Sequence, residues 1–214
     1  MSPTLPPSTL VLDACILMSG LLRPFLLDLA KKGVFSPIWN ERIGMEWQRN
    51  AARIWPVSAQ LLASEWAKMQ ADFPKANMGD VSEIESKLIH CDQKDRHVAA
   101  SGLLAVRDHH YPDVTVLTWN TKDFSRSELR KHQLGLSDPD LLLSRWWPIH
   151  NASMRESLST VIHDLFDSGR RQPEPVINMI RRERLYRLAK LYDRDKAPET
   201  TCPAILSNGR ACDS

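Results

Sequence analysis

Short apolar runs that alternate with stretches of helical periodicity constrain the fold of this chain more than any other feature. Residues 9–12, 34–38 and 114–118 have the pattern of buried strands. After the first run, apolar residues recur at helical spacing over 21–32, and Gly33 is suited to end that helix. Strands separated by helices need crossover connections, so we expect an α/β fold with a central, mainly parallel sheet.

Helix start signals divide the rest of the chain. Asn40 and Ser58 are expected N-caps of two helices, the first reaching about residue 54 and the second ending before Pro74. Further helices are expected at 81–88, from Asp92 to about 109, toward 132, from Pro139 to 146, at 152–167 and at 175–193, with a short strand at 134–136. The strand signals end before residue 147. We therefore expect an α/β domain over 1–149, a helical C-terminal extension over 150–196 and an irregular tail over 197–214.

Composition narrows the class of protein. The 214 residues are 43% hydrophobic, enough for one core with a small appendage. No apolar stretch approaches the roughly 20 residues of a membrane span, and the first eight residues carry no basic side chain, so we expect a cytoplasmic protein without a membrane segment. The four cysteines, Cys15, Cys91, Cys202 and Cys212, have no zinc-like spacing, and we expect reduced thiols.

Charge is distributed unevenly along the chain. Residues 170–196 hold nine Lys and Arg against four Asp and Glu, a net charge of +5, whereas residues 1–169 have a net charge of −2. An acidic body with a basic C-terminal piece indicates a polyanionic partner. The basic residues Arg181, Arg182 and Arg184 accompany apolar residues at helical spacing, which is typical of a docked amphipathic helix. Their charges form either a solvated face, an RNA-guiding surface or a protein-binding surface.

Four acidic residues stand where strand or helix geometry could bring them together. Asp13 and Asp123 each follow an expected strand, at the edge where open α/β sheets bind ligands. Glu46 lies beside the apolar stripe of the helix that begins after Asn40, and an ionised carboxylate there needs a partner. Asp95 falls in the first turn of the helix expected from Asp92, where the macrodipole stabilises a carboxylate.

Each of these acids also has a simpler interpretation. Asp13 could cap the helix after the first strand, and Asp123 could be a turn residue. Glu46 could pair on its own helix, and Asp92 with Asp95 could form a capping pair. The candidate helical partners of Glu46 are Arg42, Arg49 and Asn50.

As a set, the four carboxylates match the chemistry of phosphodiester hydrolysis. One or two Mg²⁺ or Mn²⁺ ions can activate water, neutralise the transition state and assist the leaving oxygen. These hard cations prefer oxygen ligands, so clustered Asp and Glu suffice. Clustered carboxylates repel one another, which would raise at least one pKa until a cation binds. The sequence lacks a Gly-rich phosphate loop, a His-Glu-x-x-His motif and a Gly-x-Ser-x-Gly motif.

Four segments containing these acids resemble, in their order, those of a PIN domain, and more narrowly those of the VapC-like ribonuclease toxins of bacterial toxin–antitoxin pairs. The segments are Val11–Ala14, Trp39–Glu41 followed by Glu46–Asn50, Asp92–Ala100 and Thr118–Phe124. The Asp-Arg-His-Val-Ala-Ala run and the Asn-Thr-Lys-Asp-Phe run are the most specific pieces. The resemblance covers about residues 8–147, and residues 150–214 resemble more weakly the helical extension of some of these toxins.

The resemblance implies a three-layer α/β/α sandwich with Asp13, Glu46, Asp95 and Asp123 at a metal site and Asn120 beside it. It also implies attack of water on phosphorus without a covalent intermediate, a structured RNA substrate such as transfer RNA, a small cognate antitoxin and a homodimer. Arg96 or His97 could steady a phosphate.

These expectations combine into one functional hypothesis, a Mg²⁺- or Mn²⁺-dependent endoribonuclease. Asp13 and Asp95 would be metal ligands, Glu46 a ligand or water-orienting base, and Asp123 a carboxylate for a second metal or an outer-sphere contact. Two alternatives stay open: a non-catalytic RNA- or protein-binding module on the same scaffold, and a flap-type DNA nuclease with the same acid cluster.

Overall fold

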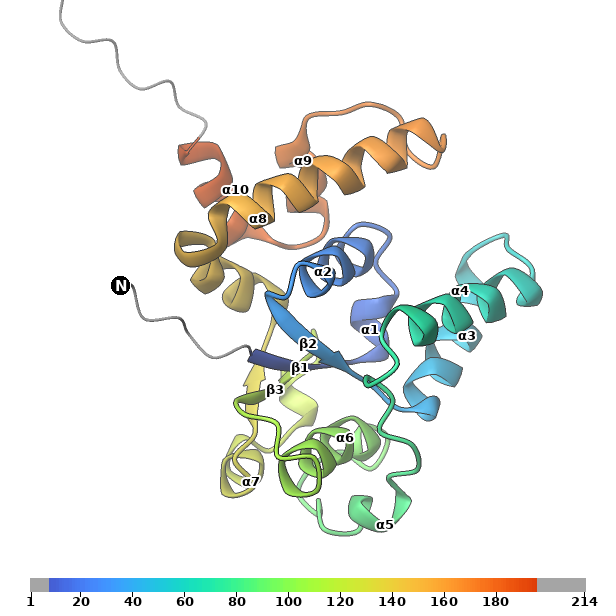
Figure 1. Ribbon diagram of the computed structural model, residues 1–214, viewed down its shortest axis with the longest axis vertical. Coiled ribbons are helices and arrows are strands. Elements are labelled where there is room, and N and C mark those ends of the chain that lie inside the picture. The colour runs from blue at the N-terminus through green and yellow to red at the C-terminus, as the bar shows by residue number, and fades with distance from the viewer. Residues whose placement is uncertain (1–7, 196–214) are drawn as a thin grey trace, which may run out of the picture.

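A computed structural model describes residues 8–195, which form an α/β fold around a four-stranded, all-parallel sheet (Figure 1). The strands are β1 (Ser8–Leu12), β2 (Phe35–Ile38), β3 (Val114–Leu117) and β4 (Gly135–Ser137), in the order β2-β1-β3-β4. The central strands pair with Leu12 opposite Leu117. Leu10, Val11 and Val116 are fully buried, as expected of strands covered on both faces.

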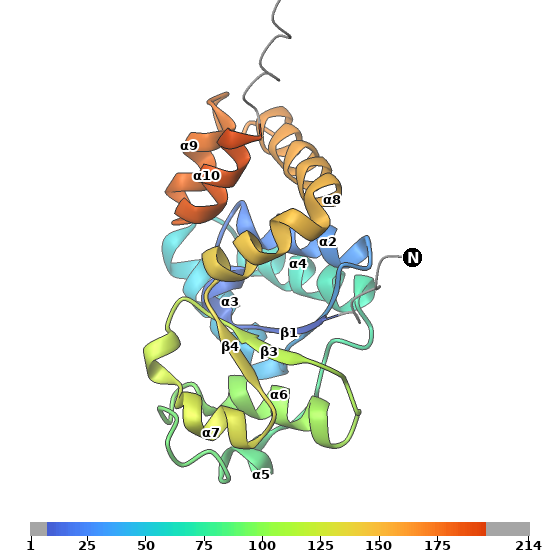
Figure 2. The ribbon, with the colours of Figure 1, turned by 90° about the vertical axis from the view of Figure 1, so that its left-hand side faces the viewer.

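Helices cover both faces of the sheet. They are α1 (Ala14–Leu17), α2 (Leu22–Lys31), α3 (Glu41–Ile54), α4 (Ala59–Asp72), α5 (Ser82–Glu85), α6 (Arg96–Arg107), α7 (Arg126–Lys131), α8 (Pro139–Asp167), α9 (Val176–Arg182) and α10 (Tyr186–Arg194), with a 3₁₀ helix η1 at Thr121–Asp123. Helices α2 and α8 lie on one side of the sheet, and α6 and α7 lie on the other (Figures 1 and 2). This arrangement confirms the predicted three-layer α/β/α sandwich with a parallel sheet.

Local capping explains where several helices begin. Asn40 accepts a hydrogen bond from the Ile43 amide at 2.9 Å, and Ser58 accepts one from the Leu61 amide at 3.2 Å, so both predicted N-caps are confirmed. The Asn40 amide group also donates to the His97 carbonyl at 2.9 Å and to Ser101 Oγ at 2.8 Å. The start of α3 is thereby joined to α6.

The helix predicted to start at Asp92 begins at Arg96 instead. Asp92 Oδ1 accepts from the Lys94 amide at 2.9 Å, which makes a local turn before the helix. Asp95 occupies the N-cap position, and its side chain makes no capping hydrogen bond. The alternative in which these two acids form a capping pair is therefore wrong, because the Asp92 carboxylate accepts from the Lys94 amide and the Asp95 amide donates to the Asp92 carbonyl.

The C-terminal helices begin and end at different residues from those predicted. The two helices expected at 139–146 and 152–167 form the single element α8, kinked at His150, which has φ −116° and ψ 25°. The helix expected over 175–193 is divided into α9 and α10, because Arg184 adopts a positive φ of 63°. The predicted boundary near residue 150 thus coincides with a kink inside a helix, and the predicted tail over 197–214 lies outside the described residues.

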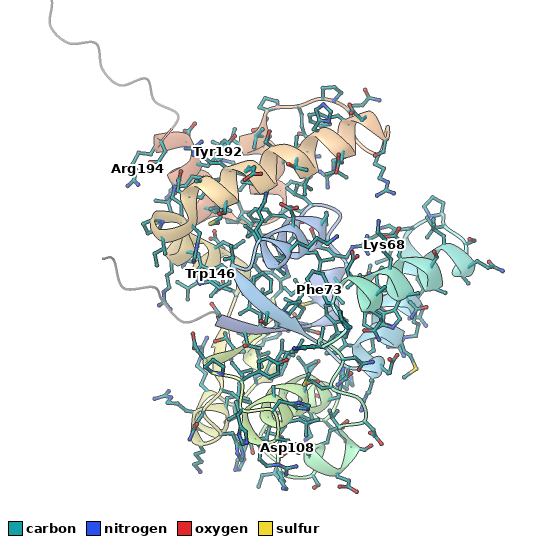
Figure 3. The ribbon with its side chains drawn as sticks, viewed as in Figure 1. Lys68, Phe73, Asp108, Trp146, Tyr192 and Arg194 are labelled. Atoms are coloured by element: carbon teal, nitrogen blue, oxygen red, sulfur yellow. The ribbon has the colours of Figure 1, made fainter. Side chains whose placement is uncertain are left out.

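Specific contacts attach the C-terminal helices to the body. Trp146 of α8 is labelled in Figure 3. It packs against Phe35 of β2, with ring centroids 5.6 Å apart. Asp140 at the start of α8 accepts hydrogen bonds from the Arg187 and Leu188 amides at 2.9 and 3.0 Å, so it caps the first turn of α10. The helical extension is consequently docked on the same core as the sheet.

Two further expectations concern membranes and thiols. Within residues 8–195, no helix has the length and apolar character needed to cross a membrane. Cys15 and Cys91 are free thiols, as expected, whereas Cys202 and Cys212 lie outside the described part of the chain.

Candidate active site

Asp13 lies at the carboxyl end of β1, directly before α1. It occupies the N-cap position of α1, but its side chain makes no capping hydrogen bond. Instead, Oδ2 accepts from Thr118 Oγ1 at 2.6 Å and from the Cys15 thiol at 3.1 Å. Thr118 directly follows β3, so the ends of the two central strands are linked through this carboxylate. Asp13 thus takes the N-cap position that the simpler interpretation predicted, but its side chain does not cap the helix.

Cys15 acts as a donor in this site. Burial, followed by the charge of Asp13, raises the pKa of its thiol to about 12, so the thiol keeps its proton at neutral pH. Its sulfur also accepts from the Trp119 amide at 3.4 Å. A protonated thiol is a poor metal ligand and a poor nucleophile, so Cys15 contributes to the orientation of Asp13.

The segment after β3 delivers Asn120 and Asp123 to the same edge. The backbone amide of Asn120 donates to Thr118 Oγ1 at 3.0 Å. The backbone amide of Asp123 donates to the backbone carbonyl of Asn120 at 3.0 Å within η1. The Asp123 carbonyl in turn accepts from the Asp92 amide at 2.8 Å. This bond holds the loop before α6 against the loop after β3, and Asp95 is carried to the edge with it.

The pKa of Asp95 is shifted by the other acidic side chains at this edge. Its pKa is raised from 3.8 to about 6, first by burial and then by the charges of Asp13, Asp123 and Asp92. Two carboxylates distant in sequence, those of Asp13 and Asp123, and the neighbouring carboxylate of Asp92 are therefore close enough to Asp95 to disfavour its ionisation. Of the predicted set, Asp13, Asp95 and Asp123 converge electrostatically at the carboxyl edge of β1 and β3.

Glu46 of α3 contacts His97 of α6, and it does not act on Asp95 as the other acidic residues do. His97 Nε2 lies 3.4 Å from Glu46 Oε2, and Arg42 Nε lies 3.7 Å from Glu46 Oε1. Burial acts to raise the pKa of Glu46, but His97, Arg42 and Arg49 outweigh it and the pKa is lowered. The side chain of Glu46 is 24% exposed, so an ionised carboxylate is available to solvent. The simpler interpretation, pairing with Arg42 on the same helix, holds alongside this contact.

The phosphate-binding roles considered for Arg96 and His97 do not suit their positions. His97 is fully buried within α6 against Glu46, so it has no surface to offer to RNA. The Arg96 guanidinium donates to the carbonyls of Cys91 and Ile89 at 3.2 and 3.1 Å. Arg96 thereby fixes the loop before α6, and His97 contacts the Glu46 carboxylate from within the protein.

The turn between α9 and α10 reaches the segment that carries Asn120. The guanidinium carbon of Arg184 lies 5.7 Å from the centre of the Trp119 ring. Glu183 accepts from Ser19 Oγ at 2.5 Å and from Arg171 at 3.2 Å, which anchors the turn to the segment after α1. Arg181, Arg182 and Arg184 are all exposed, and Arg182 makes two 2.8 Å hydrogen bonds to Glu174. Of the basic residues singled out in the sequence, Arg184 is the one placed beside the candidate site.

The donor set fits a hard divalent cation in its chemistry. Within residues 8–195, no three His, Cys, Asp or Glu side chains stand close enough together to hold a metal ion as they are placed. Mg²⁺ keeps several waters and is commonly bound through one or two carboxylates plus substrate phosphates, so a closed protein cage is not required. Asp13, Asp95 and Asp123 supply such oxygen donors, and a cation among them would relieve the repulsion on Asp95.

Thr118, Trp119 and Cys15 belong to the site, but the candidate residues chosen from sequence did not include them. Thr118 has a readable signal, because it is a polar residue at the end of a buried strand. The thiol of Cys15 has none, since its contacts with Thr118 and Trp119 depend on residues that β3 brings close. No protein-family model, curated protein or solved structure matches this chain.

Proposed function

We propose that the protein is a metal-dependent endoribonuclease that hydrolyses RNA phosphodiester bonds at the edge formed by Asp13, Asp95 and Asp123. The observation that supports this most is the raised pKa of Asp95, caused first by burial and then by the charges of Asp13 and Asp123. The Thr118–Asp13 hydrogen bond joins the ends of β1 and β3 at this edge. The resemblance to PIN domains and VapC-like toxins, carried by the same residues, points to the same chemistry.

Each side chain has a defined task in this proposal. Asp13 is held by two donors, so its free oxygen keeps a fixed direction for a cation. Below about pH 6, Asp95 is mostly protonated in the metal-free state, and a bound cation would displace that proton. Glu46, ionised and partly exposed, would accept a proton from the attacking water, and Asp123 with Asn120 would contact the substrate side of the site. When bound, Mg²⁺ or Mn²⁺ supplies positive charge next to the scissile phosphate and acidifies water.

The substrate and partners follow from the resemblance and from charge. A structured RNA, such as transfer RNA, would extend from the acidic edge toward Arg184, whose charge favours a phosphate. In this proposal the protein works in the cytoplasm, forms a homodimer and is held inactive by a small cognate antitoxin.

The first experiment is incubation of total cellular RNA with purified, antitoxin-free protein in Mn²⁺ or Mg²⁺. Discrete fragments should appear, and they should vanish with EDTA and in the double variant Asp13→Asn/Asp95→Asn. Asp108→Asn is the matched control, because Asp108 follows the last turn of the helix that Asp95 precedes (Figure 3). Cleavage that persists in the double variant would contradict the assignment of the site.

A non-catalytic RNA- or protein-binding module is the second candidate. It is favoured by the finding that no three potential ligands among residues 8–195 are grouped for a metal. Folded protein that is stabilised by Mn²⁺ and binds RNA but cleaves none would favour this function. Substituting single-stranded and flap DNA for RNA in the same assay tests the third possibility, a flap-type DNA nuclease.

A further inference from the structure

Glu128 of α7 is a buried carboxylate outside the four acidic residues discussed above, and only 4% of its surface is exposed. A carboxylate so deeply buried needs several hydrogen-bond donors. Both of its oxygens accept from the backbone amide of His90, at 3.1 Å each. The Cys91 thiol and the backbone amide of Ile89 also hydrogen-bond to it. Glu128 therefore binds three consecutive residues of the loop before α6.

These donors keep Glu128 ionised. Burial acts to raise its pKa, but the hydrogen bonds from the His90 amide and the Cys91 thiol outweigh it and the pKa is lowered. Burial raises the pKa of Cys91 to about 11, so the thiol keeps its proton at neutral pH and can donate it in a hydrogen bond. Hydrogen bonds to an ionised acceptor are stronger than those between neutral groups. The attachment of the loop to α7 is thus charge-assisted.

The local sequence predicts a different role for Glu128. Ser125 and Glu128 have the spacing of a capping box, in which the glutamate side chain accepts from the backbone amide of the capping serine. One half of this motif is present, because Ser125 Oγ accepts from the Glu128 amide at 3.3 Å. The Ser125 amide, however, hydrogen-bonds to the sulfur of Cys91. The Glu128 carboxylate instead binds His90, which is 38 positions away in the sequence.

The loop that Glu128 holds leads directly to Asp95. The Asp92 amide donates to the Asp123 carbonyl at 2.8 Å, and the Asp95 amide donates to the Asp92 carbonyl at 2.9 Å. The Arg96 guanidinium donates to two carbonyls of the same loop, at 3.2 and 3.1 Å. Glu128 therefore fixes the donors of this loop, and Arg96 fixes its carbonyls.

We propose that Glu128 is a positioning residue that holds the loop before α6 so that Asp95 stays beside Asp13 and Asp123. Without the carboxylate, buried donors of the loop lack an acceptor, and the loop opens more often. The consequence for metal binding rests on the proposed function, whereas the placement of the loop does not. Residues that orient metal ligands typically change metal affinity by about ten- to a hundredfold.

Hydrogen exchange tests the placement of the loop. With EDTA present, the backbone amides of Asp92 and Asp95 should exchange about tenfold faster in Glu128→Gln than in the wild type, as measured by NMR. Gln keeps the side-chain length and one acceptor, but its NH₂ group cannot accept from the His90 amide.

Asp140→Asn is the matched control for this variant. Asp140 is also a buried carboxylate that accepts from backbone amides, but these amides belong to α10. The control should lose global stability, measured by urea unfolding, and leave the exchange of the Asp92 and Asp95 amides unchanged. Unchanged exchange in Glu128→Gln, or the same acceleration in both variants, would overturn the proposal.

Calorimetric titration with Mn²⁺ tests the consequence for the metal site. Affinity should fall about tenfold in Glu128→Gln and stay at the wild-type value in Asp140→Asn, at a temperature where both variants are folded. Faster exchange with unchanged Mn²⁺ affinity would contradict the positioning role. Absence of Mn²⁺ binding by the wild type would contradict the proposed function instead, and hydrogen exchange would still decide whether Glu128 holds the loop.

Two substitutions of Cys91 provide a test that does not depend on the folding of Glu128→Gln. Cys91→Ser keeps a donor for the Glu128 carboxylate, whereas Cys91→Ala has none, and the two side chains differ by one hydroxyl group. The Asp92 and Asp95 amides should exchange faster in the Ala variant than in the Ser variant. Equal exchange rates in these two variants would count against the contact between Glu128 and the loop.

Discussion

Thr118 Oγ1 donates a 2.6 Å hydrogen bond to Asp13 Oδ2, joining residues that are 105 positions apart in the sequence. The bond directs the Asp13 carboxylate toward the sheet edge, whereas a capping role would direct it into α1. The Cys15 thiol donates to the same oxygen at 3.1 Å. The other carboxylate oxygen is thereby left for a cation or a substrate group.

Replacing Thr118 with Val should weaken metal binding. Val has nearly the same shape but no donor, so the buried Asp13 carboxylate loses its shortest hydrogen bond. We expect Mn²⁺ affinity to fall about tenfold, the scale found for residues that orient metal ligands, and the free energy of unfolding to fall by about 1–2 kcal/mol. Calorimetric Mn²⁺ titration and urea unfolding at neutral pH measure the two effects. Thr115→Val, the same change within β3, should leave Mn²⁺ affinity intact.

Replacing Asp95 with Asn should stabilise the metal-free protein at neutral pH. The folded-state pKa of Asp95, about 6, exceeds its ordinary value of 3.8, so its stabilising contribution is present below about pH 4 and is lost as pH rises through 6. The side-chain amide of Asn is uncharged, so it does not lose stability as the pH rises. At pH 7.5 in EDTA, we expect Asp95→Asn to raise the free energy of unfolding by about 1–2 kcal/mol, a value discounted for partial exposure.

At pH 4.5 the gain from Asp95→Asn should largely disappear, because wild-type Asp95 is then mostly protonated in the folded state. Urea unfolding at the two pH values checks this. Asp108 is a useful comparison, since its hydrogen bond with Arg107 lowers its pKa, and Asp108→Asn should not stabilise the protein at pH 7.5. An equal gain at both pH values for Asp95→Asn would mean that charge repulsion is not its source.

Replacing Arg184 with Ala should weaken RNA binding and flatten its salt dependence. The side chain is exposed and lies over Trp119, next to Asn120. Loss of one phosphate contact should reduce the slope of log affinity against log salt by about 0.7–1. Binding of transfer RNA to a non-cleaving Asp13→Asn background, measured over a range of salt concentrations, provides this slope. Arg182→Ala is the matched control, because that guanidinium is already paired with Glu174, and it should change the slope less.

Replacing Gly44 with Ala should destabilise the protein, although helix propensity alone predicts a gain of about 1 kcal/mol. A Cβ at residue 44 of α3 would overlap the Trp66 ring of α4. We expect the free energy of unfolding to fall by about 1–3 kcal/mol, as in other overpacked cores. Thermal and urea unfolding report the change. Gly20→Ala, where a Cβ meets no atom within 4 Å, should be close to neutral, and a stabilised Gly44→Ala protein would contradict the packing.

Much of the fold could be predicted because its signals are local. The N-caps at Asn40 and Ser58 act on amides three positions away, and the buried strands are continuous apolar runs. The start of α6 could not be predicted in this way. Asp92 has the side chain of a helix cap, yet its amide bonds to the Asp123 carbonyl and its carboxylate closes a turn to Lys94. A contact with a distant loop prevailed over local capping preference.

The sequence by itself determined that the chain builds a parallel sheet and that Asp13 and Asp123 follow strands at one edge, because periodicity and strand direction depend on neighbouring residues. Only the tertiary structure decided which donors hold Asp13, how strongly acidic neighbours raise the pKa of Asp95, and that α9 and α10 separate at Arg184 beside Trp119. These properties depend on distances between atoms of residues far apart in the chain. Such distances arise when the core packs, and no local pattern encodes them.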